Sequence, residues 1–219
     1  ALIETVFPVQ KVSFEAQRER KAGSGQALTA LGSYWKGRKP LILVRAIILG
    51  SLLPQTDDAE KDLEIFEALM AFDAQGLGRR AVPAAGLKPS EIAKMITLNN
   101  PWDYFSFKIT EGCELSEQDV SAWWFPLNAE GHGLKLSWKR GINDAAKSDI
   151  YAKALATLPT YEERSLLCKR PEEVDQEFLL APVWAQVNFQ LRHLGINANC
   201  MEELIEQLGI LRFGHRPKV

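Results

Sequence analysis

The chain has 219 residues, which is enough for one large domain or two small ones. It carries 26 lysines and arginines against 28 aspartates and glutamates, a net charge of −2, and 46% of its residues are hydrophobic. This composition excludes a disordered or collagen-like chain. A chain of this length buries roughly 70% of the surface that its unfolded form exposes, so we expect a hydrophobic core.

The three cysteines and three histidines show no metal-ligand spacing, so reduced thiols and no bound metal are expected. No signal peptide is visible, because Glu4 and Pro8 interrupt the first apolar stretch. The longest apolar run, 41–53, would span about 20 Å as a helix, which is too short to cross a bilayer. The sequence therefore predicts a cytoplasmic protein with no membrane partner.

Positive charge is concentrated near the N-terminus. Residues 1–50 contain eight lysines and arginines but three glutamates, a balance of +5, which leaves −7 for the other residues. This asymmetry indicates an anionic partner for the N-terminal part. The alternative, which stays open, is that these charges are simply solvated on long helices.

Hydrophobic spacing predicts helices in the N-terminal part. Pro40 suits a first turn, and the apolar run 41–53 predicts a helix that lies centrally because it is apolar nearly all round. Asp57 and Asp58 are candidate N-caps of a second helix, which should pack its apolar side and expose its acidic side. The following stretch, 75–89, holds five glycines or prolines and is predicted to be a loop.

The middle and C-terminal parts combine short strands with further helices. Strands are expected within 102–109 and over 134–138, and a helix is expected to start near Ser116. A short helix is predicted over 91–96 in the middle part. C-terminal helices are predicted over 144–158 from an Asp144 N-cap, after the Thr160–Glu163 capping box, over 181–194, and from Asn199 to Gly209. The predicted class is mainly α with a minor β hairpin or short strands, and α+β is the alternative. We divide the chain into a basic helical region, a loop-rich and tryptophan-rich segment, and a C-terminal helical segment: 1–74, 75–142 and 143–219.

One arginine lies inside the apolar run. Arg45 follows Leu41 by about one helical turn, so a helix would carry it toward the core. A lone buried charge costs several kcal/mol, so Arg45 must have a partner. The two candidates are a structural carboxylate and a bound anion.

The stretch 33–40 reads Ser-Tyr-Trp-Lys-Gly-Arg-Lys-Pro and places two aromatics beside three cations. Aromatic rings can stack on bases, while lysine and arginine neutralise phosphates. The N-terminus of the following helix favours an anion as well. The alternative is that Tyr34 and Trp35 fill the core and that the cations are solvated.

Two weaker motifs carry no predicted function. Ala22-Gly23-Ser24-Gly25 lacks the apolar strand that precedes a nucleotide-binding glycine loop. Asn100-Pro101-Trp102 lacks the second proline of the Asn-Pro-Pro-aromatic signature of amino-methyltransferases, and no apolar strand precedes it. We therefore predict no catalytic, cofactor-binding or metal-binding residue in this chain.

The N-terminal part also shows a family resemblance. It is carried by Leu2-Ile3-Glu4, Phe7-Pro8 and Glu15-Ala16-Gln17-Arg18-Glu19, and then by Trp35, Gly37-Arg38-Lys39-Pro40-Leu41 and Arg45-Ala46. These residues resemble the N-terminal, uncharacterised region of adenine-specific DNA methyltransferases that are encoded among anti-phage defence genes. Lys36 departs from the pattern, since it replaces the second residue of the family's Trp-Trp pair. The family's glycine motif and catalytic Pro-Pro-aromatic motif are absent from this chain.

The resemblance implies a fragment of a DNA N6-adenine methyltransferase from a phage-defence or restriction-modification system, with the methyltransferase domain following residue 219. S-adenosylmethionine would be the cofactor of the complete enzyme, and none is expected in the fragment. Together with the charge pattern, the resemblance predicts these DNA-contacting residues: Arg18, Lys21, Trp35, Lys36, Arg38 and Lys39. The alternative is a protein-interaction module of a multi-subunit defence complex, with its surface at the tryptophan-rich middle: Trp102, Trp123, Trp124 and Trp138.

Overall fold

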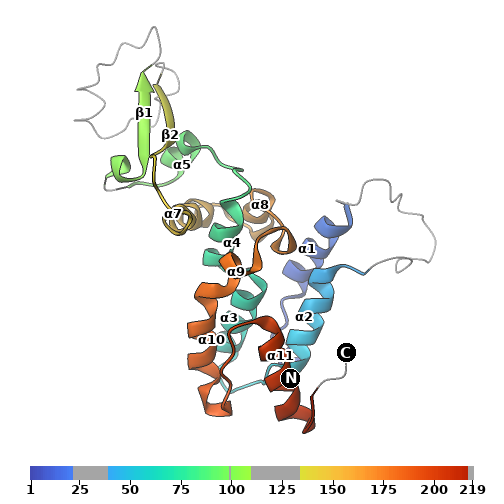
Figure 1. Ribbon diagram of the computed structural model, residues 1–219. Helices are drawn as coiled ribbons and strands as arrows, with labels where there is room; N and C mark the ends of the chain where they lie inside the picture. The colour runs from blue at the N-terminus through green and yellow to red at the C-terminus, as the bar shows by residue number, and fades with distance from the viewer. Residues whose placement is uncertain (22–38, 99, 110–133, 217–219) are drawn as a thin grey trace, which may run out of the picture. The chain divides into compact units, whose positions relative to one another are not determined.

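The computed structural model describes residues 1–21, 39–98, 100–109 and 134–216 (Figure 1). They form a mainly helical protein with a two-stranded antiparallel sheet, which confirms the predicted class. The chain divides into two compact units: residues 1–76 with 170–219 form unit 1, and residues 77–169 form unit 2. The three-part division made from the sequence stays a prediction. In the described ranges, no helix is both long and apolar enough to cross a lipid bilayer.

Unit 1 is built around one helix, α2 (Leu41–Leu52), which confirms the helix predicted there. Its neighbours are α1, α3, α11 and two 3₁₀ helices, η1 and η4. The bounds of the unit 1 elements are η1 Leu2–Glu4, α1 Val9–Lys21, α3 Ala59–Met70, η4 Pro171–Glu173, α9 Gln176–Leu180, η5 Ala181–Val183, α10 Trp184–Leu191, η6 Arg192–Leu194 and α11 Met201–Phe213. No element was predicted at η1, η4 or α9.

The helix is central in unit 1 as predicted, but it is not buried on every side. One side of α2 is buried through Ile42, Ala46, Leu49 and Gly50. The other side leaves large apolar side chains 37–45% exposed: Leu41, Val44, Ile47 and Ile48. The reason is geometric, since the neighbours of α2 cover only part of its circumference and a uniformly apolar sequence does not show which part.

A carboxylate from α1 caps the start of α2. The Glu19 side chain accepts hydrogen bonds from the Leu41 amide at 2.8 Å and from the Ile42 amide at 3.1 Å. Pro40, at the N-cap position, makes no side-chain cap. Glu19 therefore satisfies two of the free amides of the first turn and places negative charge at the positive end of the helix. The anion expected at this helix start is supplied by the chain itself.

The second helix, α3, confirms one of the two predicted caps. Asp58 accepts a hydrogen bond from the Lys61 amide at 3.2 Å. The acidic side of the helix is not fully exposed as predicted, because Asp62 is 4% exposed. Its carboxylate accepts hydrogen bonds from the amide and hydroxyl of Thr56, at 2.7 and 2.9 Å. These bonds compensate the desolvation of a buried acid.

The predicted loop at 75–89 is wrong over its first half, which belongs to α4 (Ala74–Ala81). Its glycines serve close packing. A Cβ on Gly78 would lie 2.3 Å from the carbonyl oxygen of Ser148, in α7 (Asp144–Ala156), so only glycine allows this approach. Glycine was thus a contact residue here and not a helix breaker.

Arg80 of α4 is fully buried in unit 2. Its guanidinium donates to the Lys169 carbonyl at 2.8 Å, to the Ser165 hydroxyl at 3.1 Å and to the Tyr161 hydroxyl at 3.3 Å. These three hydrogen bonds compensate the loss of hydration of the buried charge. An arginine in an exposed loop would stay hydrated and would not need them.

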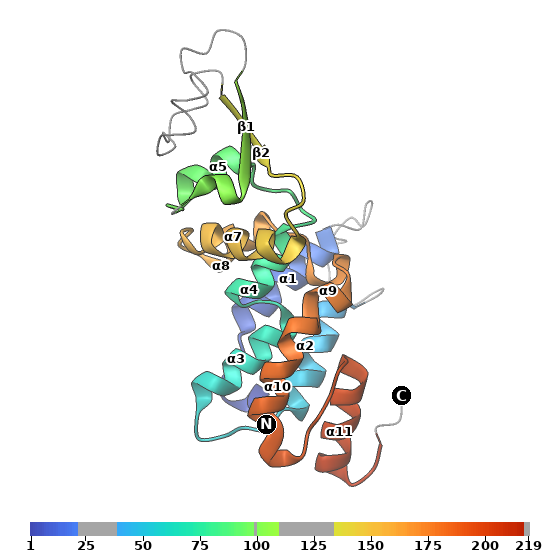
Figure 2. The same ribbon diagram turned by 60° about the vertical axis from the view of Figure 1, so that its left-hand side comes forward.

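The rest of unit 2 contains α5 (Pro89–Met95), the 3₁₀ helix η2 (Pro101–Asp103), the strands β1 (Phe105–Ile109) and β2 (Leu134–Trp138), and α8 (Tyr161–Leu166). The strands pair antiparallel, with Phe105 opposite Trp138 and Ile109 opposite Leu134. Figure 2 shows α5 beside this ribbon, in agreement with the contacts between α5 and β2. The predicted strands and the Thr160–Glu163 capping box are confirmed. The helix predicted near Ser116 lies outside the described residues.

Several predicted helix ends are displaced; the N-cap of α11, for example, is Cys200 and not Asn199. The cap of α7 is Asn143, one residue before the predicted Asp144, and accepts a hydrogen bond from the Ala146 amide. At the other end of the chain, α11 continues through Gly209 to Phe213 and ends at Gly214, whose φ of 74° is left-handed. A glycine inside a helix costs about 1 kcal/mol without ending it. The left-handed backbone is what ends the helix.

Replacing Glu19 by alanine should lower the free energy of unfolding by about 1–2 kcal/mol, because two amides of α2 lose their acceptor and the helix end loses its counter-charge. Urea denaturation monitored by circular dichroism measures this change. The control is Gln17→Ala, at an exposed position of the same helix, which should change stability by less than about 0.5 kcal/mol. Equal effects of the two substitutions would contradict the capping role.

Candidate functional site

The predicted DNA-contacting residues fall into two groups. Trp35, Lys36 and Arg38 lie outside the described residues. Lys21 is the last residue of α1, and its side chain is outside the description as well. The structure describes the side chains of Arg18 and Lys39, and that of the possible anion-binding residue Arg45.

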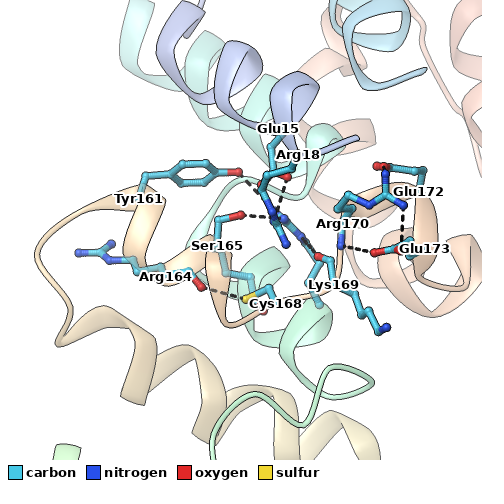
Figure 3. Close-up of polar contacts among 12 residues, drawn as sticks. Glu15, Arg18, Tyr161, Arg164, Ser165, Cys168, Lys169, Arg170, Glu172 and Glu173 are labelled. Atoms are coloured by element: carbon cyan, nitrogen blue, oxygen red, sulfur yellow. Dashed lines mark hydrogen bonds and ion pairs between the residues drawn. The ribbon is translucent and has the colours of Figure 1, made fainter. Parts of the chain in front are cut away.

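Arg18 is held by an acidic neighbour on its own helix. Its Nη1 lies 3.1 Å from Oε2 of Glu15, and the side chains are 17% and 1% exposed respectively (Figure 3). Lys39 is exposed and immediately precedes Pro40 and α2. Because Glu19 bonds the first amides of α2, the end of α1 meets the start of α2. Arg18 and Lys39 are therefore brought to the same end of this helix pair.

Arg45 lies in a groove of unit 1 between α2, η4 and α11. The groove has a volume of about 260 Å³. Its lining is apolar except for one arginine and one glutamate: Leu41, Ile42, Val44, Arg45, Ile48, Glu172, Met201 and Ile205. Three of these residues belong to the exposed side of α2. The exposed apolar side chains of α2 thus form part of a concave surface.

The partner of Arg45 is neutral. Its Nη2 donates to Oε1 of Gln176 at 2.9 Å. The Gln176 amide nitrogen donates to the carbonyls of Pro171 at 2.9 Å and Val174 at 2.8 Å, which fixes the amide oxygen toward the arginine. Nη1 of Arg45 is buried and has no hydrogen-bond partner among the described residues.

The structure gives Arg45 a neutral partner and not the predicted structural carboxylate, while anion binding by Arg45 stays a prediction. Burial lowers the pKa of Arg45, and the negative charges of Glu172 and Glu202 oppose this shift. No carboxylate of the described residues lies within ion-pair distance of the guanidinium, so these charges act from further away.

Glu172 is the second charged residue of the groove. Its side chain is 16% exposed, and its Oε1 lies 3.1 Å from Nη1 of Arg170 (Figure 3). Both carboxylate oxygens are buried without a hydrogen bond among the described residues. Arg170 makes its hydrogen bonds with Glu173, at 2.9 Å through Nη2 and 3.1 Å through its amide. Burial raises the pKa of Glu172 above its usual value.

The groove therefore holds, beside an apolar wall, one buried donor without a hydrogen bond and one buried carboxylate whose Oε1 forms an ion pair with Arg170. Such a set suits binding of a group that both accepts and donates hydrogen bonds. The lining holds no hydroxyl, thiol or imidazole that could act as a nucleophile. Among the described residues, no group of three or more His, Cys, Asp or Glu side chains could hold a metal ion.

Sequence reasoning missed Glu172 and Gln176. They lie more than 120 positions after Arg45, and the hydrogen bond to Gln176 spans 131 positions. A short Pro-Glu-Glu segment has no local feature that marks it as the wall of a groove. The position of Arg45 inside an apolar run was the one available signal. It indicated that Arg45 needs a partner but not which distant residue would provide the hydrogen bond.

One comparison with known proteins gives a match. Residues 6–69 match a family model described as a protein of unknown function, DUF1156. A DUF1156 domain therefore lies at residues 6–69, and it spans α1, α2 and nearly all of α3. This match covers less than a third of the chain. No curated protein and no solved structure matches the chain.

Replacing Glu172 by glutamine should raise the free energy of unfolding near pH 7. Because the folded pKa lies above the unfolded value of about 4.3, the folded state holds a proton that the unfolded state lacks between these two values. The wild-type protein therefore loses stability as the pH rises through this window. The advantage of Glu172→Gln should vanish below about pH 4, where both states are protonated.

Urea denaturation of both proteins at several pH values between 4 and 8 measures this difference. Glu177→Gln, at an exposed position of α9, is the matched control and should not be more stable than wild type at pH 7. A Glu172→Gln protein that is less stable than wild type at pH 7 would contradict the prediction.

Proposed function

We propose that this chain is the N-terminal, non-catalytic part of a cytoplasmic, adenine-specific DNA methyltransferase of a phage-defence or restriction-modification system, and that it contacts DNA. The observation that carries the proposal is the DUF1156 match at residues 6–69. It covers the stretch on which most of the methyltransferase resemblance rests. The complete enzyme would use S-adenosylmethionine as methyl donor, and no described residue is assigned to that cofactor.

The DNA contact is assigned first to Lys36, Arg38 and Lys39. Three cations within four residues can neutralise adjacent phosphates and release their counterions. Arg18 is already paired with Glu15, so its charge is partly compensated. Lys21 and Trp35 complete the proposed set, in which the tryptophan would stack on a base.

The test is fluorescence anisotropy of the chain with a labelled DNA duplex at 50 and 200 mM salt. The triple variant Lys36→Ala, Arg38→Ala, Lys39→Ala should bind at least tenfold more weakly at 50 mM salt. Its slope of log affinity against log salt should be shallower by roughly 2.7, since each lost phosphate contact removes about 0.9.

The control removes three exposed lysines elsewhere, Lys88→Ala, Lys153→Ala and Lys169→Ala. It makes the same change in net charge. Equal loss of affinity in the two triple variants would show a general charge effect and would contradict a specific contact at residues 36–39.

A second candidate function is a protein-interaction module of a defence complex. The tryptophan-rich middle gives it no support in the described residues, because Trp102 packs on Phe107 and Trp138 packs on Phe105 and Tyr151. Trp123 and Trp124 lie outside the description. The observation that favours an interaction is instead apolar exposure in unit 1, on the outer side of α2 and at the end of α11: Leu41, Val44, Ile47, Ile48, Ile210, Leu211 and Phe213.

The double variant Ile47→Glu, Ile48→Glu tests this second candidate. If α2 binds an apolar segment of another subunit, the variant should no longer co-elute in size-exclusion chromatography with proteins encoded by neighbouring genes. Leu166→Glu, at a 65% exposed position of α8, is the control. Unchanged co-elution of the α2 variant would exclude this surface.

A further inference from the structure

The β1–β2 ribbon of unit 2 has two chemically different faces. Successive side chains of a strand point to opposite sides. One side packs into the core of the unit through aromatic and aliphatic residues: Phe105, Phe107, Leu136 and Trp138. The other side is exposed and polar: Ser106, Lys108, Lys135 and Ser137. We call this second side the outer face of the ribbon.

The register of the strands sets like charges opposite one another on the outer face. Lys108 pairs directly with Lys135, and Ser106 pairs with Ser137, whose hydroxyls are 3.0 Å apart. Side chains opposite each other have Cβ atoms about 5 Å apart, and like charges in this position destabilise a sheet. Neither lysine has an ion-pair or hydrogen-bond partner in the described part of the chain. A bound anion would remove this repulsion.

Positive charge continues past the end of β2. Lys139 is exposed, and its ammonium donates to the Trp102 carbonyl at 3.1 Å, which holds it beside the base of the ribbon. Arg140 follows and is exposed as well. Among the described residues, the acid nearest in sequence to β1 is Asp103, which accepts a hydrogen bond from the Asn100 side-chain amide at 2.9 Å. The described strands themselves contain no acidic residue.

We infer that the outer face of the ribbon is a second DNA-binding surface, which takes the backbone phosphates of a B-form duplex on Lys108 and Lys135. A two-stranded β-ribbon fits the major groove of B-form DNA. The deep and narrow major groove of A-form RNA does not admit it. A membrane surface is disfavoured because the outer face offers serines and lysines and none of the large apolar side chains that insert into lipid. The serine pair next to the lysine pair on this face supplies hydroxyls for phosphates or base edges.

This inference deepens the proposed function and rests on it for the choice of DNA. It differs from the proposed contact because it places a surface in unit 2, with residues that neither the resemblance nor the DUF1156 match includes. The two contacts can therefore fail separately.

The first test replaces both opposed lysines in the full chain, Lys108→Thr and Lys135→Thr. Threonine favours strands, so the ribbon should persist. Anisotropy with a labelled 20-base-pair duplex at 50 mM salt should show at least tenfold weaker binding, and the salt slope should fall by about two, one for each lost phosphate contact. The control Lys88→Ala, Lys153→Ala removes the same charge from exposed positions off the ribbon and should bind as wild type.

A single substitution separates binding from folding. Lys108→Glu would place a carboxylate opposite Lys135 and turn repulsion into attraction across the ribbon. The melting temperature should stay the same or rise, while DNA affinity should fall. A purely structural role for Lys108 would not move these two readouts in opposite directions. DNA binding as tight as wild type by this variant would overturn the inference.

Comparing the variants and the ligands shows which of the two proposals fails. Weaker binding by the ribbon variants with an unaffected Lys36, Arg38, Lys39 variant would support the ribbon and contradict the N-terminal contact, and the reverse result would overturn the ribbon. Two other ligands test the choice of DNA: a duplex RNA of the same length, and vesicles with 30% phosphatidylserine. Tighter binding of either ligand than of DNA, through Lys108 and Lys135, would overturn that choice. No binding of wild type to the DNA duplex at 50 mM salt would overturn both proposals.

Discussion

The hydrogen bonds of Glu19 to the first amides of α2 are the constraint on which unit 1 depends. They join helices separated in sequence by residues 22–40, and they set the end of α1 against the start of α2. α2 then provides the surface that η1, α3, η4 and α11 contact. The acidic residues of the basic N-terminal part are thus structural: Glu19 caps a helix, and the buried Glu15 pairs with Arg18.

This arrangement changes how an anionic partner could bind. From the sequence, the start of the 41–53 helix offered a partial positive charge to a phosphate. In the structure that position already holds the Glu19 carboxylate, and a second anion would meet its repulsion. Any phosphate contact near α2 must therefore come from side-chain cations and not from the helix end. The basic segment that precedes the helix is where the chain provides them.

Features that depend on residues close together in the sequence were predicted correctly, whereas contacts between distant residues were not. The Asp58 cap, the Thr160–Glu163 box and the strand 134–138 were predicted because each depends on residues within a few positions. The loop predicted around Gly78 was wrong because close packing against the Ser148 carbonyl, and not a chain break, explains this glycine. The exposed side of α2 was not predicted because its sequence is apolar on every side. Arg45 was identified as needing a partner, yet nothing local indicated that Gln176 would provide it. The site residues at 22–38 lie outside the described structure, so their predicted roles stay predictions.

The paired lysines of the ribbon have a consequence for how copies of the protein behave at high concentration. In the part of the chain that the structure describes, the sheet has two strands, so each strand has an outer edge with backbone groups free to pair. Such strands can pair edge to edge between molecules and seed β-aggregates. Lys108 and Lys135 lie on those strands, and a second ribbon aligned alongside would bring further ammonium groups next to them. The like charges on each ribbon would therefore oppose such pairing between copies of the protein.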